Sequence, residues 1–291
     1  MFSLTSRDKN SGFSAIESRD NFYQSVSYYP MPFALVTTVD DEGFTSIGPH
    51  SLCMPFGVIK EHAMILITRK DSNTAQNIRR SKQANLNFVP YSRRKLKNIV
   101  AMGFPGQKPR EKMKDNPYNL VQSPTSSRNA PSQFPLIIEE AIQVYECSWD
   151  ETDEFIYKRT TTEAYFLLKV ENILLQNKWH KKLKAGKGFP CMPISYGFRN
   201  GSDFWFAKHK RPFQLPVPTD RGEKDSTILY QANRIASDVQ FTPEAAAKLR
   251  PVPKIFLGKA LQGIVKEAQE QNVGVVDEEF MNKLHAKRKN P

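Results

Sequence analysis

Residues 33–52, FALVTTVDDEGFTSIGPHSL, and residues 63–89, AMILITRKDSNTAQNIRRSKQANLNFV, decide the fold of this chain. The first stretch predicts a β-hairpin, because a run rich in β-branched residues stops at an acidic turn in which Gly43 can adopt a positive φ. The return strand contains Gly48 and Pro49, and proline cannot donate to a strand ladder. We therefore expect this strand to bulge or fray there and to expose its backbone.

The second stretch predicts a strand, a short helix and another strand. The strand over 63–68 is followed by Ser72 and Asn73, either of which can cap the helix. Arg69 and Lys70 precede this helix start. The free N–H groups of a helix N-terminus, with cations and hydroxyls beside them, form a seat suited to a phosphate group.

In order and spacing, these residues resemble the flavin reductase-like family of FMN-binding split barrels. The motifs that carry the resemblance are Gly48-Pro49-His50-Ser51, Lys70-Asp71-Ser72-x-Thr74-x-x-Asn77-Ile78, the strand over 84–89 and, more weakly, Glu146-Cys147. The chain has Ser46, Gly48 and His50 where that family has Asn, Ala and an aromatic residue. The resemblance covers about residues 20 to 215.

The resemblance implies an α+β fold, mainly β, in which an antiparallel split β-barrel binds FMN. The cofactor-binding residues that it implies are Ile47, Gly48, Pro49, His50, Ser51, Lys70, Asp71, Ser72, Thr74 and Asn77. His50 is the candidate catalytic residue, because its ring can donate a hydrogen bond to the flavin or to a substrate. A lone histidine beside a proline is more often only a satisfied surface residue, and a hydroxyl cluster at a helix start is more often only a cap.

The function that follows is that of an FMN-binding oxidoreductase, either an NAD(P)H-dependent flavin reductase or a protein that reduces a small acceptor through its flavin. NADH or NADPH is the expected hydride donor. Hydride transfer between two cofactors needs the protein to position their rings more than to supply acid–base catalysis. The absence of a catalytic triad motif therefore does not argue against this function. The alternatives are a split barrel that binds or acts on haem or another tetrapyrrole, and a non-catalytic basic scaffold. By resemblance, we also expect a homodimer and a small-molecule electron acceptor.

Composition limits the remaining choices. The chain has 291 residues, 39% of them hydrophobic, and a formal net charge of +12. Its basic clusters are scattered and accompany no nucleic-acid-binding motif, so we expect no nucleic-acid partner. No apolar run has the length of a transmembrane helix and the first residues lack a signal peptide core, so we expect a cytoplasmic protein with no membrane contact. The three cysteines are widely spaced, which predicts buried, reduced thiols.

The pattern of the chain predicts its domains. We expect a flexible arm over 1–20, the split-barrel domain over 21–218, a linker over 219–238 and a small helical domain over 239–291. Inside the barrel domain, the elements that the pattern predicts are a lead-in helix over 21–30, a helix over 91–101, strands over 139–147 and 164–175, and a hairpin over 193–206. The Pro- and Ser-rich stretch over 103–135 is expected to cover the cofactor or a neighbouring subunit.

The C-terminal segment predicts helices. Thr242 can cap a short helix, and Asp277 can cap the last one. Between them one apolar stripe is formed by Phe256, Leu257, Ala260, Leu261, Ile264, Val265 and Ala268. The order of these features resembles the small C-terminal domain of the light-independent protochlorophyllide reductase B subunit. The chain has Leu257 and Leu261 where that family has arginines, and Val265 where it has Glu. A role of this helical domain as a docking or dimer-stabilising cap is simpler than a role in tetrapyrrole chemistry.

Overall fold

The chain folds into two compact units, Met1–Phe213 (unit 1) and Gln214–Pro291 (unit 2). The computed structural model describes residues 13–58, 61–104, 106, 108–125, 134–151, 162–199, 203–216 and 224–289. Of the arm expected over 1–20, residues 13–19 are irregular and exposed, and residues 1–12 lie outside the described residues.

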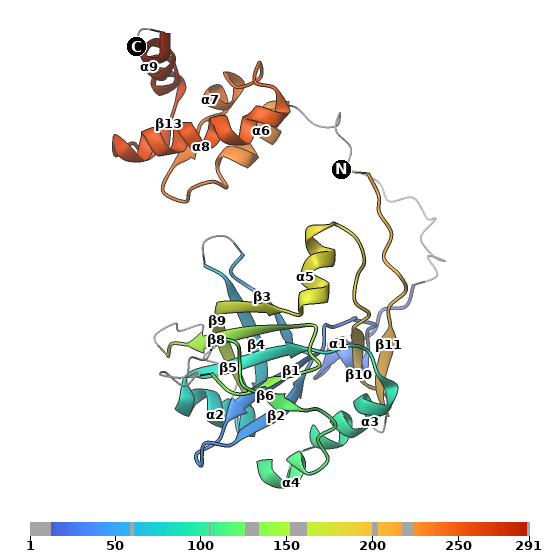
Figure 1. The fold of residues 1–291 in the computed structure, drawn as a ribbon. Helices are drawn as coiled ribbons and strands as arrows, with labels where there is room; N and C mark the ends of the chain where they lie inside the picture. Colours follow the sequence, from blue (N-terminus) through green and yellow to red (C-terminus); the bar gives the residue numbers. More distant parts are fainter. Residues whose placement is uncertain are drawn as a thin grey trace. The chain divides into compact units, whose positions relative to one another are not determined.

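Unit 1 contains most of the strands (Figure 1). Its helices are α1 (Phe22–Ser25), α2 (Asn73–Ser81), α3 (Arg93–Met102), α4 (Pro109–Met113) and α5 (Asn177–Lys184). Its strands are β1 (Ala34–Val39), β2 (Thr45–His50), β3 (Cys53–Pro55), β4 (Ala63–Arg69), β5 (Gln83–Phe88), β6 (Leu120–Val121), β7 (Ile137–Ile138), β8 (Gln143–Trp149), β9 (Glu163–Leu175), β10 (Pro193–Arg199) and β11 (Asp203–Lys208).

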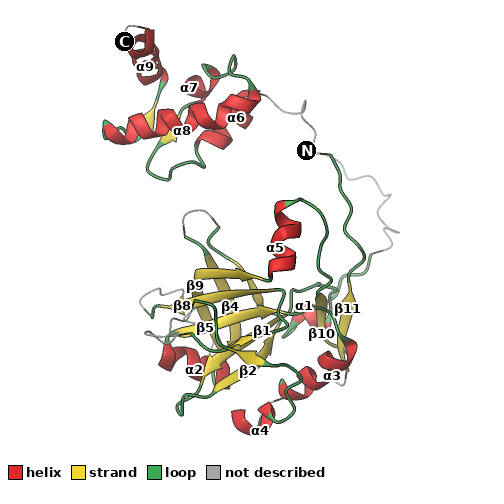
Figure 2. Cartoon of the chain, in the orientation of Figure 1, coloured by secondary structure: helices red, strands yellow, loops and turns green. Residues whose placement is uncertain are grey.

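Seven of these strands form one antiparallel sheet in the order β2-β1-β5-β8-β9-β4-β3, which curls into a half-barrel (Figure 2). Side chains alternate across the sheet, so Val36, Leu86 and Phe166 join one buried cluster with α2, while Leu35 joins another with α3. The α+β, mainly β fold predicted from the sequence is therefore confirmed, and α2 and α3 bring their ends to the edge of the sheet that holds β2.

The prediction that the return strand bulges at Gly48 and Pro49 is wrong. Strand β2 pairs with β1 in one continuous register, from Ala34 opposite His50 to Val39 opposite Thr45. Proline is tolerated because β2 is the edge strand, so the side of its backbone that lacks an N–H donor has no neighbouring strand to bond. The hairpin turn itself is as predicted, with Gly43 at φ +80°.

The stretch over 103–135 is tied to the sheet by polar side chains. Asn85 Nδ2 donates to the carbonyl of Pro135 at 2.6 Å. Just after it, the N–H of Leu136 donates to Thr45 Oγ1 and the N–H of Ile138 donates to Asn87 Oδ1. Farther back in this stretch, α4 packs against β2. Residues 126–133 lie outside the described part of the chain.

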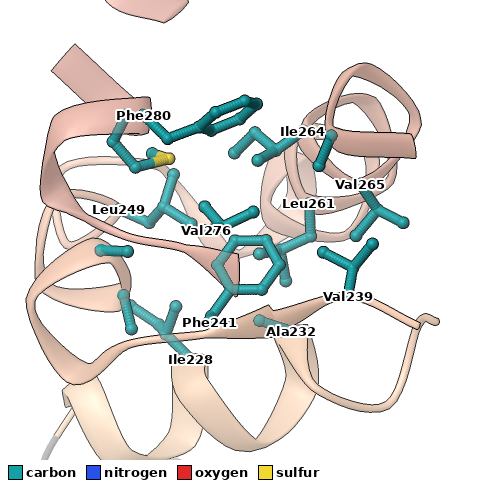
Figure 3. Packing of buried hydrophobic residues seen from close by; sticks show 14 of the residues in the cluster. Ile228, Ala232, Val239, Phe241, Leu249, Leu261, Ile264, Val265, Val276 and Phe280 are labelled. Atoms are coloured by element: carbon teal, nitrogen blue, oxygen red, sulfur yellow. The ribbon is translucent and has the colours of Figure 1, made fainter. Parts of the chain in front are cut away.

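Unit 2 has its own hydrophobic core (Figure 3). Its elements are α6 (Lys224–Ala232), β12 (Gln240–Phe241), α7 (Pro243–Ala247), α8 (Lys254–Glu270), β13 (Val275–Val276) and α9 (Glu278–Lys289). Figure 3 shows Leu261, Ile264 and Val265 of α8 directed at the same interior as Phe241 and Phe280. The predicted caps are present, since Thr242 Oγ1 and Asp277 Oδ1 each accept from a backbone N–H three residues later.

The prediction of a linker over 219–238 is wrong for most of that range. Helix α6 lies inside it and places Ile228 and Ala232 in the core of unit 2, and the unit begins at Gln214 rather than after residue 218. The helix could not be predicted from the sequence, because only a few residues of this polar stretch are apolar. Those few face inward and make too short a periodic pattern.

The length of the helices and the state of the cysteines can be compared with the expectations from composition. None of the described helices has the length and apolar character needed to cross a bilayer. The three cysteines are free, and Cys53 and Cys147 are buried as predicted, whereas Cys191 is half-buried. Burial raises the pKa of Cys53 to about 12, so this thiol is protonated at neutral pH.

Candidate functional site

A cavity of about 700 Å³ opens at the edge of the half-barrel, between β2, the turn that joins β4 to α2, the end of α3 and the hairpin of β10 and β11. Its volume lies within the range of small-molecule and cofactor sites, roughly 300 to 1,000 Å³. The cavity therefore lies where the two motifs of the sequence analysis come together in space.

Eight of the ten predicted cofactor-binding residues line this cavity. They are Ile47, Gly48, Pro49, His50 and Ser51 on β2 and just after it, and Asp71, Ser72 and Thr74 at the start of α2. These two groups are about twenty residues apart in the sequence, and the sheet brings the edge strand alongside the helix N-terminus.

The other two predicted residues do not line the cavity. Lys70 is exposed, and its backbone carbonyl accepts a hydrogen bond from Arg79 at 2.8 Å. Asn77 is buried, and its Nδ2 donates to Thr38 Oγ1 at 3.0 Å and to Ser46 Oγ at 3.3 Å. Asn77 therefore fastens α2 to the β1–β2 hairpin instead of facing a ligand.

The two motifs touch at Gly48. A Cβ atom at this position would clash with Thr74 Oγ1 and lie 3.0 Å from His50 Nε2. His50 Nε2 in turn lies 3.1 Å from Thr74 Oγ1, within hydrogen-bond distance. The absence of a side chain at Gly48 is thus what lets β2 approach the first turn of α2.

The hydroxyls at the site already have partners in the protein. Ser72 Oγ accepts from the N–H of Ala75 at 3.1 Å and lies 3.0 Å from Thr68 Oγ1, so Ser72 caps α2 as predicted. Ser51 Oγ donates to Ser195 Oγ at 2.8 Å. These contacts fix the hydroxyls in place, and each oxygen retains capacity for a further hydrogen bond.

His50 is neutral in the folded protein. Burial lowers its pKa from 6.5 to about 4, because the protein interior solvates the imidazolium poorly. At neutral pH its ring therefore carries one N–H donor and one acceptor. Such a ring can donate or accept a hydrogen bond without adding charge to the cavity.

Two cations also line the cavity, of which Arg69 was expected beside the phosphate seat and Lys112 was not expected at the site. Arg69 lies at the end of β4, and Lys112 comes from α4, in the stretch over 103–135. Burial, and after it the positive charge of Arg69, lower the pKa of Lys112. The ammonium of Lys112 donates a hydrogen bond to the carbonyl of Phe104. Among the described residues neither forms an ion pair, although Asp71 and Glu163 also line the cavity.

An aromatic wall completes the cavity. Phe33 packs edge-on against Phe206, at 4.9 Å between ring centroids, and the series continues through Phe204 and Phe198 to Phe104 at the end of α3. All five rings line the cavity. Nothing in the sequence pattern of the hairpin over 193–206 shows that Phe204 and Phe206 line the same cavity as β2.

Comparison of the sequence with models of protein families finds no match, and a search of curated protein sequences finds none either. The structure does resemble solved proteins. The 2-nitrobenzoate 2-nitroreductase of Pseudomonas fluorescens is 19% identical, with a TM-score of 0.51 over 68% of this chain and 89% of that one. An FMN-binding protein of Thermus thermophilus is 16% identical, with a TM-score of 0.50 over 70% and 98%.

A third similar structure is a provisionally assigned flavin reductase with a split barrel domain from Shewanella frigidimarina. It is 14% identical, with a TM-score of 0.51 over 70% of this chain and 95% of that chain. At these identities the similarity is one of fold. It confirms the split barrel that was predicted from residues 33–89.

Proposed function

We propose that unit 1 binds FMN in this cavity and acts as an oxidoreductase, either as an NAD(P)H-dependent flavin reductase or by passing electrons through the flavin to a small acceptor. The observation that carries the proposal is that two cations, Arg69 and Lys112, line the same cavity as the N-terminus of α2 and an aromatic wall. A phosphate and a planar ring are the two chemical features of FMN.

The cation pair supports a phosphate on electrostatic grounds. Burial lowers the pKa of Lys112, and the positive charge of Arg69 lowers it further, because like charges in one cavity repel. An anion between them would remove the repulsion and accept charge-assisted hydrogen bonds from both side chains. At the start of α2, the N–H groups of Asn73 and Thr74 have no backbone acceptor within the described part of the chain, and the helix dipole there favours an anion.

The rest of the cavity suits a flavin ring. Bound FMN would supply hydride acceptance from NADH or NADPH and electron transfer to an acceptor. The residues of this chain would position the ring against the phenylalanine wall, limit the access of water and offer a neutral hydrogen-bonding group at His50. Gly48 leaves backbone exposed at the junction of β2 and α2, where a side chain would fill the space.

The names of the similar structures support the same proposal, since one is an FMN-binding protein and another is a nitroreductase. The choice between NADH and NADPH, the acceptor, the homodimer and the cytoplasmic location remain predictions from the family resemblance. No described feature of unit 2 favours tetrapyrrole chemistry, because Leu257, Leu261 and Val265 are all buried in its core.

The proposal is tested by an anaerobic reduction experiment. Purified protein is mixed with FMN, and NADH or NADPH is then added while the flavin absorbance is followed. We expect rapid bleaching with wild-type protein and with Lys70→Ala, because Lys70 lies outside the cavity. We expect the double variant Arg69→Ala/Lys112→Ala to lose most of the rate at low FMN concentration. A wild-type rate equal to the protein-free rate would contradict the enzymatic part of the proposal.

A further inference from the structure

Helix α5 (Asn177–Lys184, NKWHKKLK) differs from the other helices of unit 1 because it has at least two turns and yet buries no side chain. It follows the end of β9 and stands off the sheet (Figure 1). Its C-terminus is fixed by a Schellman motif, in which Lys187 N–H donates to the carbonyl of Lys182 and Gly186, at φ +61°, donates to that of Leu183. The end of α5 is therefore well defined by hydrogen bonds, although the helix contributes no side chain to a core.

The surface of α5 is strongly basic. Four lysines lie on the helix and a fifth follows it, namely Lys178, Lys181, Lys182, Lys184 and Lys187. Among the described residues, none of them forms an ion pair with a carboxylate. Like charges four residues apart, such as Lys178 and Lys182, destabilise a helix, and a helix of this length has little stability alone. A negatively charged partner would relieve that repulsion.

Exposed apolar side chains lie among these lysines. Leu183 is 69% exposed and Phe189, just beyond the helix, is 61% exposed. The ring of Trp179 is already approached by two ammonium groups, with Lys182 Nζ 4.6 Å and Lys178 Nζ 5.7 Å from its centroid. The surface therefore combines exposed cations with two apolar groups that no described part of the chain covers.

We infer that the α5 surface, defined by Trp179, the five lysines, Leu183 and Phe189, binds the face of an anionic lipid bilayer. Lysines near such a face are attracted by acidic headgroups, and apolar side chains between them enter the boundary with the acyl chains. A nucleic acid would use the cations but has no place for Leu183, and the lysines at Trp179 compete with base stacking. The inference departs from the expectation of no membrane contact that was drawn from the sequence. Peripheral binding needs no membrane-spanning helix, and none of the described helices could serve as one.

The inference is tested by co-sedimentation of the full chain with vesicles. Vesicles of phosphatidylcholine and phosphatidylserine are compared with vesicles of phosphatidylcholine alone. We expect the acidic vesicles to bind at least about tenfold more tightly, and charge reversal at Lys181→Glu/Lys182→Glu/Lys184→Glu to remove that preference. The matched control is Arg93→Glu/Arg94→Glu/Lys97→Glu on α3, which reverses three exposed cations elsewhere and should bind almost as wild type apart from its lower net charge.

A second pair of variants separates a bilayer from a polyanion. Leu183→Ala/Phe189→Ala should weaken binding to acidic vesicles several-fold and leave binding to a single-stranded oligonucleotide unchanged. Circular dichroism on every variant establishes that it is folded. The inference is overturned if acidic and neutral vesicles bind alike, if the α3 control loses as much binding as the α5 variant, or if the oligonucleotide binds α5 more tightly than the vesicles do.

Discussion

His50 links the edge strand to the first turn of α2, and its burial makes its protonation part of the folding equilibrium. Its pKa is about 4 in the folded chain and 6.5 when unfolded, so between these values the unfolded state binds a proton that the folded state does not. Stability from this residue is therefore intact above pH 6.5 and is lost as the pH falls toward 4. The full shift corresponds to roughly 3 kcal/mol.

This predicts a difference between wild type and His50→Gln in their pH dependence. Urea unfolding of both proteins between pH 7 and pH 4 should show a steeper loss of stability for wild type, by up to about 3 kcal/mol at the acidic end. Parallel curves for the two proteins would show that His50 does not titrate as its burial indicates.

Gly48 gives a second prediction at this scale. Gly48→Ala would force Thr74 or His50 to move, because the new methyl group clashes with Thr74 Oγ1. Overpacking of this kind costs about 1 to 3 kcal/mol, and it would also disturb the helix start. We expect lower stability in urea and weaker uptake of FMN. Gly258→Ala, where no atom lies within 4 Å of the added Cβ in the middle of α8, is the control and should stabilise the chain slightly.

The sequence allowed some site residues to be predicted and not others, for a physical reason. Ser72 and Thr74 belong to a local motif, in which the cap and the first turn are set by neighbours in the chain. Arg69 and Lys112 come to the same cavity only in the folded structure, because Lys112 lies on a helix about forty residues later in the chain. Arg69 and Lys70 were both expected beside the helix start, and Lys70 entered the predicted cofactor-binding set through the family motif. A strand pattern does not show which of the two adjacent cations lines the cavity.

At the scale of elements, most strands and helices could be predicted because their apolar periodicity is complete. The pattern over 33–89 shows alternation, and the stripe on α8 faces one core. Helices α5 and α6 could not be predicted, since α5 buries nothing and α6 has few apolar residues. The strand β2 was misjudged at Pro49 because edge position is a property of the whole sheet.

The joint between α1 and β10 gives a prediction at this scale. Gly197 lies at a register shift of β10 with φ +71°, and a Cβ there would clash with Gln24 Oε1, which accepts from Phe198 N–H at 3.1 Å. Gly197→Ala should therefore cost more stability than Gly43→Ala, which has a similar φ of +80° but open space around it. Urea denaturation measures both, and equal losses would mean that the clash is absorbed.

At the scale of the molecule, two separate cores predict two separate unfolding events. Leu261 is 1% exposed in the core of unit 2, and Leu261→Ala should destabilise that unit by about 2 to 5 kcal/mol. Calorimetry of the full chain should show one transition lowered and the other unchanged, and FMN should raise only the transition of unit 1. A single transition that responds to both changes would show that the units unfold together.

The central claim is that unit 1 binds FMN in its cavity. The binding affinities of FMN and riboflavin test this claim most directly, since the two flavins differ only in the phosphate. The account predicts that wild type and Lys70→Ala bind FMN at least about 30-fold more tightly than riboflavin. Arg69→Ala and Lys112→Ala should each lose about tenfold of that preference while riboflavin binding stays the same. Equal affinity of wild type for the two flavins, or no measurable affinity for either, would contradict the account.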